Sequence, residues 1–111
     1  MTLTTNSAPD ERADLAGWLQ ASNARLVVVA FVTDWAGGAL ILKGFLEHAE
    51  RELGEAVLIQ FIDADDQPDL TNDLGVNHIP TTVLLRDQTI VDHIDGVIPK
   101  RKLLERMAPY V

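Results

Sequence analysis

Two apolar runs dominate the hydrophobic pattern of the chain, at residues 26–32 and 57–62. The first, from Leu26 to Val32, is wholly apolar and rich in β-branched residues, and the second is interrupted by Gln60. Short runs without apolar–polar alternation are typical of strands buried on both faces, as in an α/β sheet. The pattern therefore predicts two interior strands.

The segment between these runs has the 3.6-residue apolar period of an amphipathic helix over residues 39–53. Gly54 follows directly and is a typical residue for ending a helix. The predicted apolar face consists of Leu42, Phe45, Leu46, Ala49 and Leu53. This segment is therefore expected to lie with one side against the sheet.

The remaining segments predict a hairpin and three more helices. Residues 81–85 and 89–94 are predicted strands joined by a turn at 86–88, and helices are predicted at about 10–20, 69–74 and 99–107. This order predicts one α/β domain over residues 1–111, with a central mixed sheet of four to five strands and helices on both faces. Residues 1–10 are expected to form a short strand or a flexible segment.

Charge and hydropathy exclude several classes of partner. The chain has 17 acidic and 9 basic residues, a formal net charge of −8, and such a surface repels the phosphates of nucleic acids. The apolar runs are too short to span a bilayer, and the N-terminal residues lack the basic and apolar regions of a secretory signal. We expect a cytoplasmic protein with no nucleic-acid partner and no membrane partner.

The absence of cysteine excludes a disulfide framework, a thiolate zinc site, an iron–sulfur cluster and a cysteine nucleophile. The histidines His48, His78 and His93 share no metal-ligand spacing, and His48 is better placed for a surface ion pair with Glu47 or Glu52. The aspartates between residues 63 and 69 lack the glycine and closing glutamate of a calcium-binding EF-hand loop. We predict no metal site and no cofactor.

Several landmarks of the chain resemble those of the thioredoxin family, in order and in spacing, over residues 11–108. The landmarks are Val28-Val29-Ala30-Phe31, Trp35-Ala36-Gly37-Gly38-Ala39, Asp63-Ala64-Asp65, Gly75-Val76, Ile79-Pro80-Thr81 and Gly96. The resemblance implies a thioredoxin-like fold, and it implies a cis peptide bond before Pro80.

The same landmarks depart from the family where its thiol chemistry takes place. The sequence WAGGA stands in place of WCGPC, so that Ala36 and Ala39 replace both cysteines and Gly38 replaces the proline. The family's buried aspartate corresponds to Ala30, and the lysine that pairs with it corresponds to Phe61. Because an alanine methyl cannot attack a disulfide, the resemblance implies a natural, redox-inactive member with no catalytic residue at these positions.

The former active-site face carries the residues that we predict to bind a partner. Leu40 and Ile41 follow the loop but lie off the apolar face of their helix, and contiguous exposed apolar surface usually marks an interface. The predicted contact residues are Trp35, Gly37, Gly38, Leu40, Ile41, His78, Ile79, Pro80 and Val97, with Ile98 expected in the same patch. Redox-silent relatives act as chaperones, assembly factors or subunits, some in hydrogenase maturation. The resemblance therefore implies a protein or peptide partner, and a homodimer through the same patch is a second version of this hypothesis.

An enzyme with a non-thiol site near Thr33 and His78 is the alternative hypothesis. Thr33 is the one hydroxyl near the loop, but no histidine base stands beside it in the sequence, so nucleophilic catalysis has no clear candidate. The N–H groups of residues 37–39 offer an anion site unless Asp34 already caps the helix. We expect that the protein is not a dithiol–disulfide oxidoreductase and favour a role other than catalysis.

Overall fold

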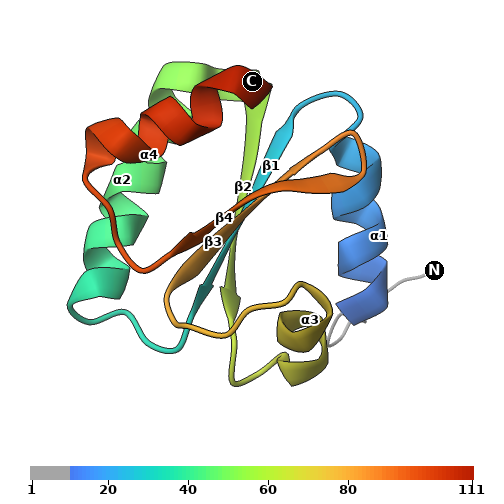
Figure 1. Cartoon of the computed structure of the whole chain (residues 1–111), viewed down its shortest axis with the longest axis vertical. Helices are drawn as coiled ribbons and strands as arrows, with labels where there is room; N and C mark the ends of the chain where they lie inside the picture. Colours follow the sequence, from blue (N-terminus) through green and yellow to red (C-terminus); the bar gives the residue numbers. More distant parts are fainter. Residues whose placement is uncertain (1–10) are drawn as a thin grey trace.

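Four strands form a mixed sheet in the order β2-β1-β3-β4 in the computed structural model, which describes residues 11–111 (Figure 1). Strand β1 (Leu26–Val32) pairs in parallel with β2 (Val57–Asp63) and antiparallel with β3 (Thr81–Arg86), and β3 pairs antiparallel with β4 (Thr89–Asp95). The predicted α/β class and mixed sheet are confirmed. The expectation for residues 1–10 lies outside the described residues.

The helices cover both faces of this sheet, as predicted. Helices α1 (Glu11–Ala21) and α3 (Pro68–Asp73) lie on one face, and α2 (Gly38–Leu53) and α4 (Lys100–Met107) lie on the other (Figure 1). Two short 3₁₀ turns, Gly54–Ala56 and Ala108–Tyr110, follow α2 and α4. Strand β1 is fully enclosed because it has a strand on each side and helices on each face, which explains its continuous apolar sequence.

The core is divided by the sheet into two clusters of buried side chains. On the α2 and α4 face, the predicted apolar side of α2 is confirmed, since Leu42, Leu46 and Ala49 are buried and Phe45 and Leu53 pack against them. On the other face, Trp18 of α1 is buried among residues of β1, β3 and α3. The fold is therefore held by apolar packing on both sides of one sheet, and the loops at the strand ends are left to form sites.

The β3–β4 hairpin turn is tied to the end of α1 by the buried residue Ser22. Its backbone carbonyl accepts hydrogen bonds from the N–H of Asp87 at 2.8 Å and from Arg86 Nη1 at 2.9 Å. Its hydroxyl oxygen accepts one from the N–H of Gln88 at 2.8 Å. Asp87 and Gln88 have positive φ angles of 53° and 65°, as expected at the two central residues of a tight hairpin turn. Ser22 thus fixes the end of the sheet that lies opposite the WAGGA loop.

Candidate partner-binding face

The WAGGA loop connects the end of β1 to the start of α2. Asp34 Oδ1 accepts a hydrogen bond from the N–H of Ala36 at 2.8 Å, so this side chain shapes the loop. The idea that Asp34 caps the helix is wrong, because the N-cap residue is Gly37 and no side chain caps it. Gly37 has φ 56° and ψ −123°, a backbone conformation that glycine adopts readily because it has no Cβ.

The four positions that the resemblance assigns to the family's thiol chemistry lie in the WAGGA loop, in the first turn of α2, in β1 and in β2. Ala36 is exposed in the loop, and Ala39 in the first turn of α2 is 8% exposed. Ala30 is fully buried in β1 and lies directly opposite Phe61 of β2 in the parallel register. The chain therefore has apolar side chains at the positions of both thiols and of the charged pair.

Trp35 is held at the rim of the loop by two side chains from different elements. Its ring meets the ring of Phe61 edge-on, with 5.2 Å between the centroids and 72° between the planes. The Lys43 ammonium lies over the indole, 5.2 Å from the ring centroid. The indole nevertheless remains 42% exposed. Sequence reasoning missed Lys43, because the contact depends on how α2 leaves the loop.

Two contacts bring the loops before β3 and after β4 to the start of α2. The Ile79–Pro80 peptide bond is cis, as expected, and the carbonyl of Pro80 accepts a hydrogen bond from the N–H of Gly96 at 2.7 Å. A Cβ added to Gly38 would lie 3.3 Å from Cγ2 of Val97. Glycine in place of the family's proline therefore lets Val97 approach the helix closely, and the three loops lie together at the lower left of the sheet in Figure 1.

Five large apolar side chains are exposed on these loops and the first turn of α2, and together they are called the loop face below. They are Trp35, Leu40, Ile41, Ile79 and Val97. Pro80 is half-buried beside them. The expectation that Ile98 belongs to this patch is wrong, because Ile98 packs against the core cluster under α2 and α4. The structure thus brings the predicted apolar contact residues to one end of the sheet.

His78 is exposed next to the loop face and points toward β4. Its Nε2 lies 3.9 Å from Oδ2 of Asp95, while Asp95 Oδ1 is 3.5 Å from Nδ1 of His93. The Thr81 hydroxyl donates a hydrogen bond to the His78 carbonyl. Thr33 is exposed, and among residues 11–111 no hydrogen bond joins it to His78. The contacts of His78 therefore do not favour the alternative enzyme site.

Within residues 11–111, the structure contains no group of three or more His, Asp or Glu side chains that could hold a metal ion. His48 Nε2 lies 3.2 Å from Glu52 Oε1 one turn along α2, as predicted for a surface pair.

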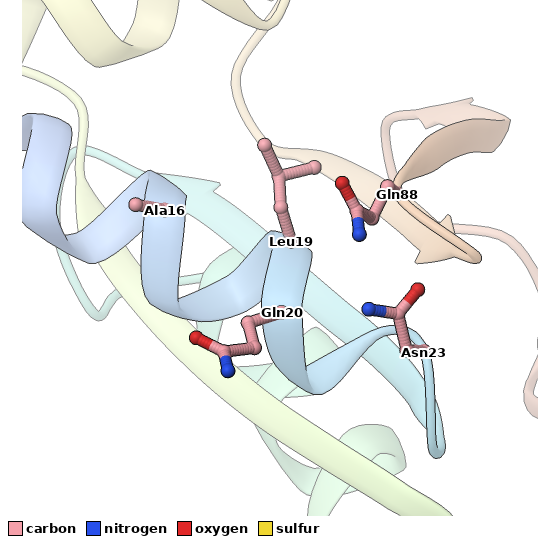
Figure 2. Close-up of a pocket in the computed structure, with 5 residues that line it drawn as sticks. All are labelled: Ala16, Leu19, Gln20, Asn23 and Gln88. Carbon is pink, nitrogen blue, oxygen red and sulfur yellow. The ribbon is translucent and has the colours of Figure 1, made fainter.

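A hollow of about 400 Å³ lies at the opposite end of the sheet. Its lining residues are Ala16, Leu19 and Gln20 of α1, Asn23 of the loop after α1, and Gln88 of the hairpin turn (Figure 2). None of these residues was singled out in the sequence as a binding residue, and the hollow is separate from the loop face.

Comparison with known proteins identifies the family. The model of the family described as thioredoxin matches residues 13–109. The thioredoxin of Listeria monocytogenes is 34% identical over 92 residues, covering 83% of this chain and 89% of that protein. The thioredoxin of Bacillus subtilis is 31% identical over 80 residues, covering 72% and 77%. The X-ray structure of Fasciola hepatica thioredoxin superposes with a TM-score of 0.80 at 27% identity, covering 90% of this chain and 94% of that one.

The fold and the loop define a thioredoxin-fold domain in which no thiol is present. The chain belongs to the thioredoxin family. Because it has no cysteine, it cannot carry out dithiol–disulfide exchange with its own side chains. None of the helices within residues 11–111 is long and apolar enough to cross a membrane.

Proposed function

We propose that this protein is a redox-silent member of the thioredoxin family that binds a polypeptide or partner protein through the loop face. Chaperone, assembly factor and adaptor are the roles that fit such binding, and hydrogenase maturation is one process in which relatives of this kind act. We place this activity in the cytoplasm. An insulin-reduction assay is expected to give no rate above background.

The distribution of exposed apolar side chains carries this proposal. In the described part of the chain, seven large hydrophobic residues are exposed, and five of them make up the loop face. The other two, Ile90 and Val111, lie on β4 and at the C-terminus. Contiguous exposed apolar surface on a protein of this size usually marks an interface, and aromatic residues such as Trp35 are enriched among the residues that dominate binding.

A photo-cross-linking amino acid placed at Leu40 tests this proposal in the native host. Leu40 is 53% exposed, so a larger side chain is accommodated there without disturbing the core. We expect defined cross-linked adducts from this position. The same amino acid at Ile90, which is 42% exposed outside the loop face, is the matched control and should give none of these adducts. Identical adducts from both positions, or adducts from Ile90 alone, would contradict the proposal.

A second copy of the chain is the homodimeric version of the same proposal. Light scattering over a range of concentrations separates the two versions. A mass that doubles with concentration in the wild type, and not in a Trp35→Ala/Ile41→Asp variant, assigns the loop face to a homodimer. A constant monomer mass would exclude the homodimer and favour a different protein as the partner of the loop face.

A further inference from the structure

We infer that the partner presents a cationic side chain flanked by apolar ones, and that this cation takes the place that Lys43 holds over the ring of Trp35. The inference rests on the proposed function and names the chemistry of the partner. It is carried by the contacts of Trp35, by the lack of an acidic partner for Lys43, and by the carboxylates beside the loop face.

Trp35 already holds a cation in the unbound protein. The indole is the ring that attracts ammonium and guanidinium groups most strongly, because its face is the negative side of its quadrupole. Phe61 contacts the ring edge-on and so helps to fix its orientation. The ring face is thus a preformed site for a positive charge, and Lys43 occupies it from within the chain.

Within residues 11–111, Lys43 has no acidic partner to hold it there. Among the described residues, no carboxylate lies within ion-pair distance of its ammonium, although Glu47 follows one turn later on α2. A lysine side chain is flexible and strongly hydrated, whereas an arginine stacks on an aromatic face with its planar guanidinium. An incoming arginine is therefore expected to displace Lys43 readily, and an incoming lysine to compete with it on similar terms.

Carboxylates lie at the ends of β1 and β2, beside the WAGGA loop. Asp63 is two residues beyond Phe61 and thus points to the same face of β2. The N–H of Ala64 donates a hydrogen bond to the carbonyl of Val32 at 2.7 Å, which keeps the next loop beside the WAGGA loop. The exposed acids at the end of β2 and in the two loops are Asp34, Asp63, Asp65 and Asp66.

Among the described residues, these acids have no opposing cation. In the part of the chain that the structure describes, none of the four forms an ion pair with a basic side chain. Their field attracts a basic segment and repels an acidic one, in a manner that salt weakens. Leu40, Ile41 and Val97 then offer the apolar contacts for side chains on either side of the partner's cation. A segment that combines one basic residue with apolar neighbours matches both parts of this surface.

Short synthetic peptides test the inference. The peptides share their leucine and isoleucine positions and differ at one central residue, which is Arg, Lys, Gln or Glu, and their dissociation constants are measured by NMR titration. We expect the affinity to fall in the order Arg, Lys, Gln, Glu, with Arg exceeding Gln by about 5- to 30-fold, as for a partly desolvated cation–aromatic contact. Raising the salt to about 0.5 M should reduce this difference.

Two pairs of variants separate the local contact from the general effect of charge. Lys43→Gln should bind the Arg peptide about 3- to 10-fold more tightly than the wild type, because the ring face is then free. Lys102→Gln makes the same change of charge at an exposed position of α4 and should have less than about a 2-fold effect. Asp65→Asn/Asp66→Asn should weaken binding of the Arg peptide, whereas Glu105→Gln on α4 should not.

The outcomes distinguish this inference from the proposed function. If the Gln and Arg peptides bind equally, and both lose binding in Trp35→Ala/Ile41→Asp, the loop face remains the binding surface and the inference is wrong. If the Arg peptide binds that variant as well as the wild type, or binds Lys43→Gln more weakly than the wild type, the inference is also wrong. If no peptide binds, the inference fails and the cross-linking from Leu40 decides the proposed function.

Discussion

Ala30 of β1 lies directly opposite Phe61 of β2 in the parallel register. These are the two positions that the resemblance to thioredoxins assigns to the family's buried aspartate and its lysine. Ala30 is fully buried, and Phe61 packs partly against the core and makes a T-shaped contact with Trp35. A buried carboxylate is unfavourable unless it is paired or has a chemical role. The apolar pair therefore fits a protein that no longer performs proton transfer for a thiol.

Restoring the charged pair tests this interpretation. Ala30→Asp alone should lower the free energy of unfolding by about 3 kcal/mol or more at pH 7, because it buries a carboxylate without a partner. Phe61→Lys alone should lower it by about 1–2 kcal/mol through the lost aromatic contacts. The double variant should lose less than the sum of the two, by about 1 kcal/mol or more. Denaturant unfolding measures all three, and strictly additive losses would contradict the pairing of these positions.

The helix start of α2 requires glycine at position 37. Gly37→Ala should lower the free energy of unfolding by about 1–2 kcal/mol, because the φ of 56° is unfavourable for a residue with a Cβ. Gly44 lies inside the same helix, and a Cβ added there would meet nothing within 4 Å. Gly44→Ala should therefore raise the free energy of unfolding by about 0.5–1 kcal/mol. A loss of equal size at both positions would show that the backbone conformation of Gly37 is not the cause.

The ion pair between Asp92 and Arg106 joins β4 to α4 with two hydrogen bonds of 2.6 Å each. The side-chain hydrogen bond from Arg106 lowers the pKa of Asp92 below its usual 3.8, although burial opposes this effect. A lowered pKa in the folded state means that the pair stabilises the fold above about pH 3.8. This stabilisation is lost as the pH falls through the pKa of the folded state.

Arg106→Gln should lower the free energy of unfolding by up to about 1 kcal/mol at pH 7, since the pair is partly exposed to solvent. The difference from the wild type should shrink as the pH falls below about 3.8, where Asp92 is protonated first in the variant, and it should vanish below the lowered pKa of Asp92 in the folded wild type. Arg101→Gln, at an exposed position of the same helix, is the control for net charge. A difference that stays constant down to pH 2 would contradict the assignment to Asp92.

The hydroxyl of Ser22 has a role that hydrogen exchange can isolate. Ser22→Ala removes the acceptor of the Gln88 N–H and should lower the free energy of unfolding by about 1–3 kcal/mol. The Asp87 N–H donates to the backbone carbonyl of Ser22, which the substitution retains. Protection of the Gln88 amide should therefore fall by more than that of the Asp87 amide. Equal loss at both amides would indicate that the whole turn opens.

Much of the fold was predictable because its signals are local. The continuous apolar sequence of β1 follows from its central position, and the periodic face of α2 follows from packing on the sheet. The position of Ile98 was predicted wrongly, since its burial depends on how the loop after β4 turns toward the core. The contacts of Asp34 with the Ala36 N–H and of Lys43 with Trp35 could not be predicted from the sequence either. Each depends on backbone directions set by the loop and by the first turns of α2.

The site was predictable to the extent that it corresponds to family landmarks. The residues of the loop face come from three separate loops and one helix turn. They were predicted to share one face because the landmarks of the sequence resemble those of the thioredoxin family in order and in spacing. The close approach of Val97 to the helix start was not predictable. It depends on a glycine without a Cβ at position 38 and on the hydrogen bond from the Gly96 N–H to the Pro80 carbonyl.

Quantitative affinity capture from the native host tests the central claim most directly, namely that the former active-site face is now a binding surface. The capture compares the wild type with Trp35→Ala/Ile41→Asp and with Ile90→Asp, which places the same charge on an exposed isoleucine outside the loop face. We predict that the wild type and Ile90→Asp recover the same partner proteins, and that Trp35→Ala/Ile41→Asp recovers at least about ten-fold less of them. Recovery of the same proteins in equal amounts by all three would contradict the account.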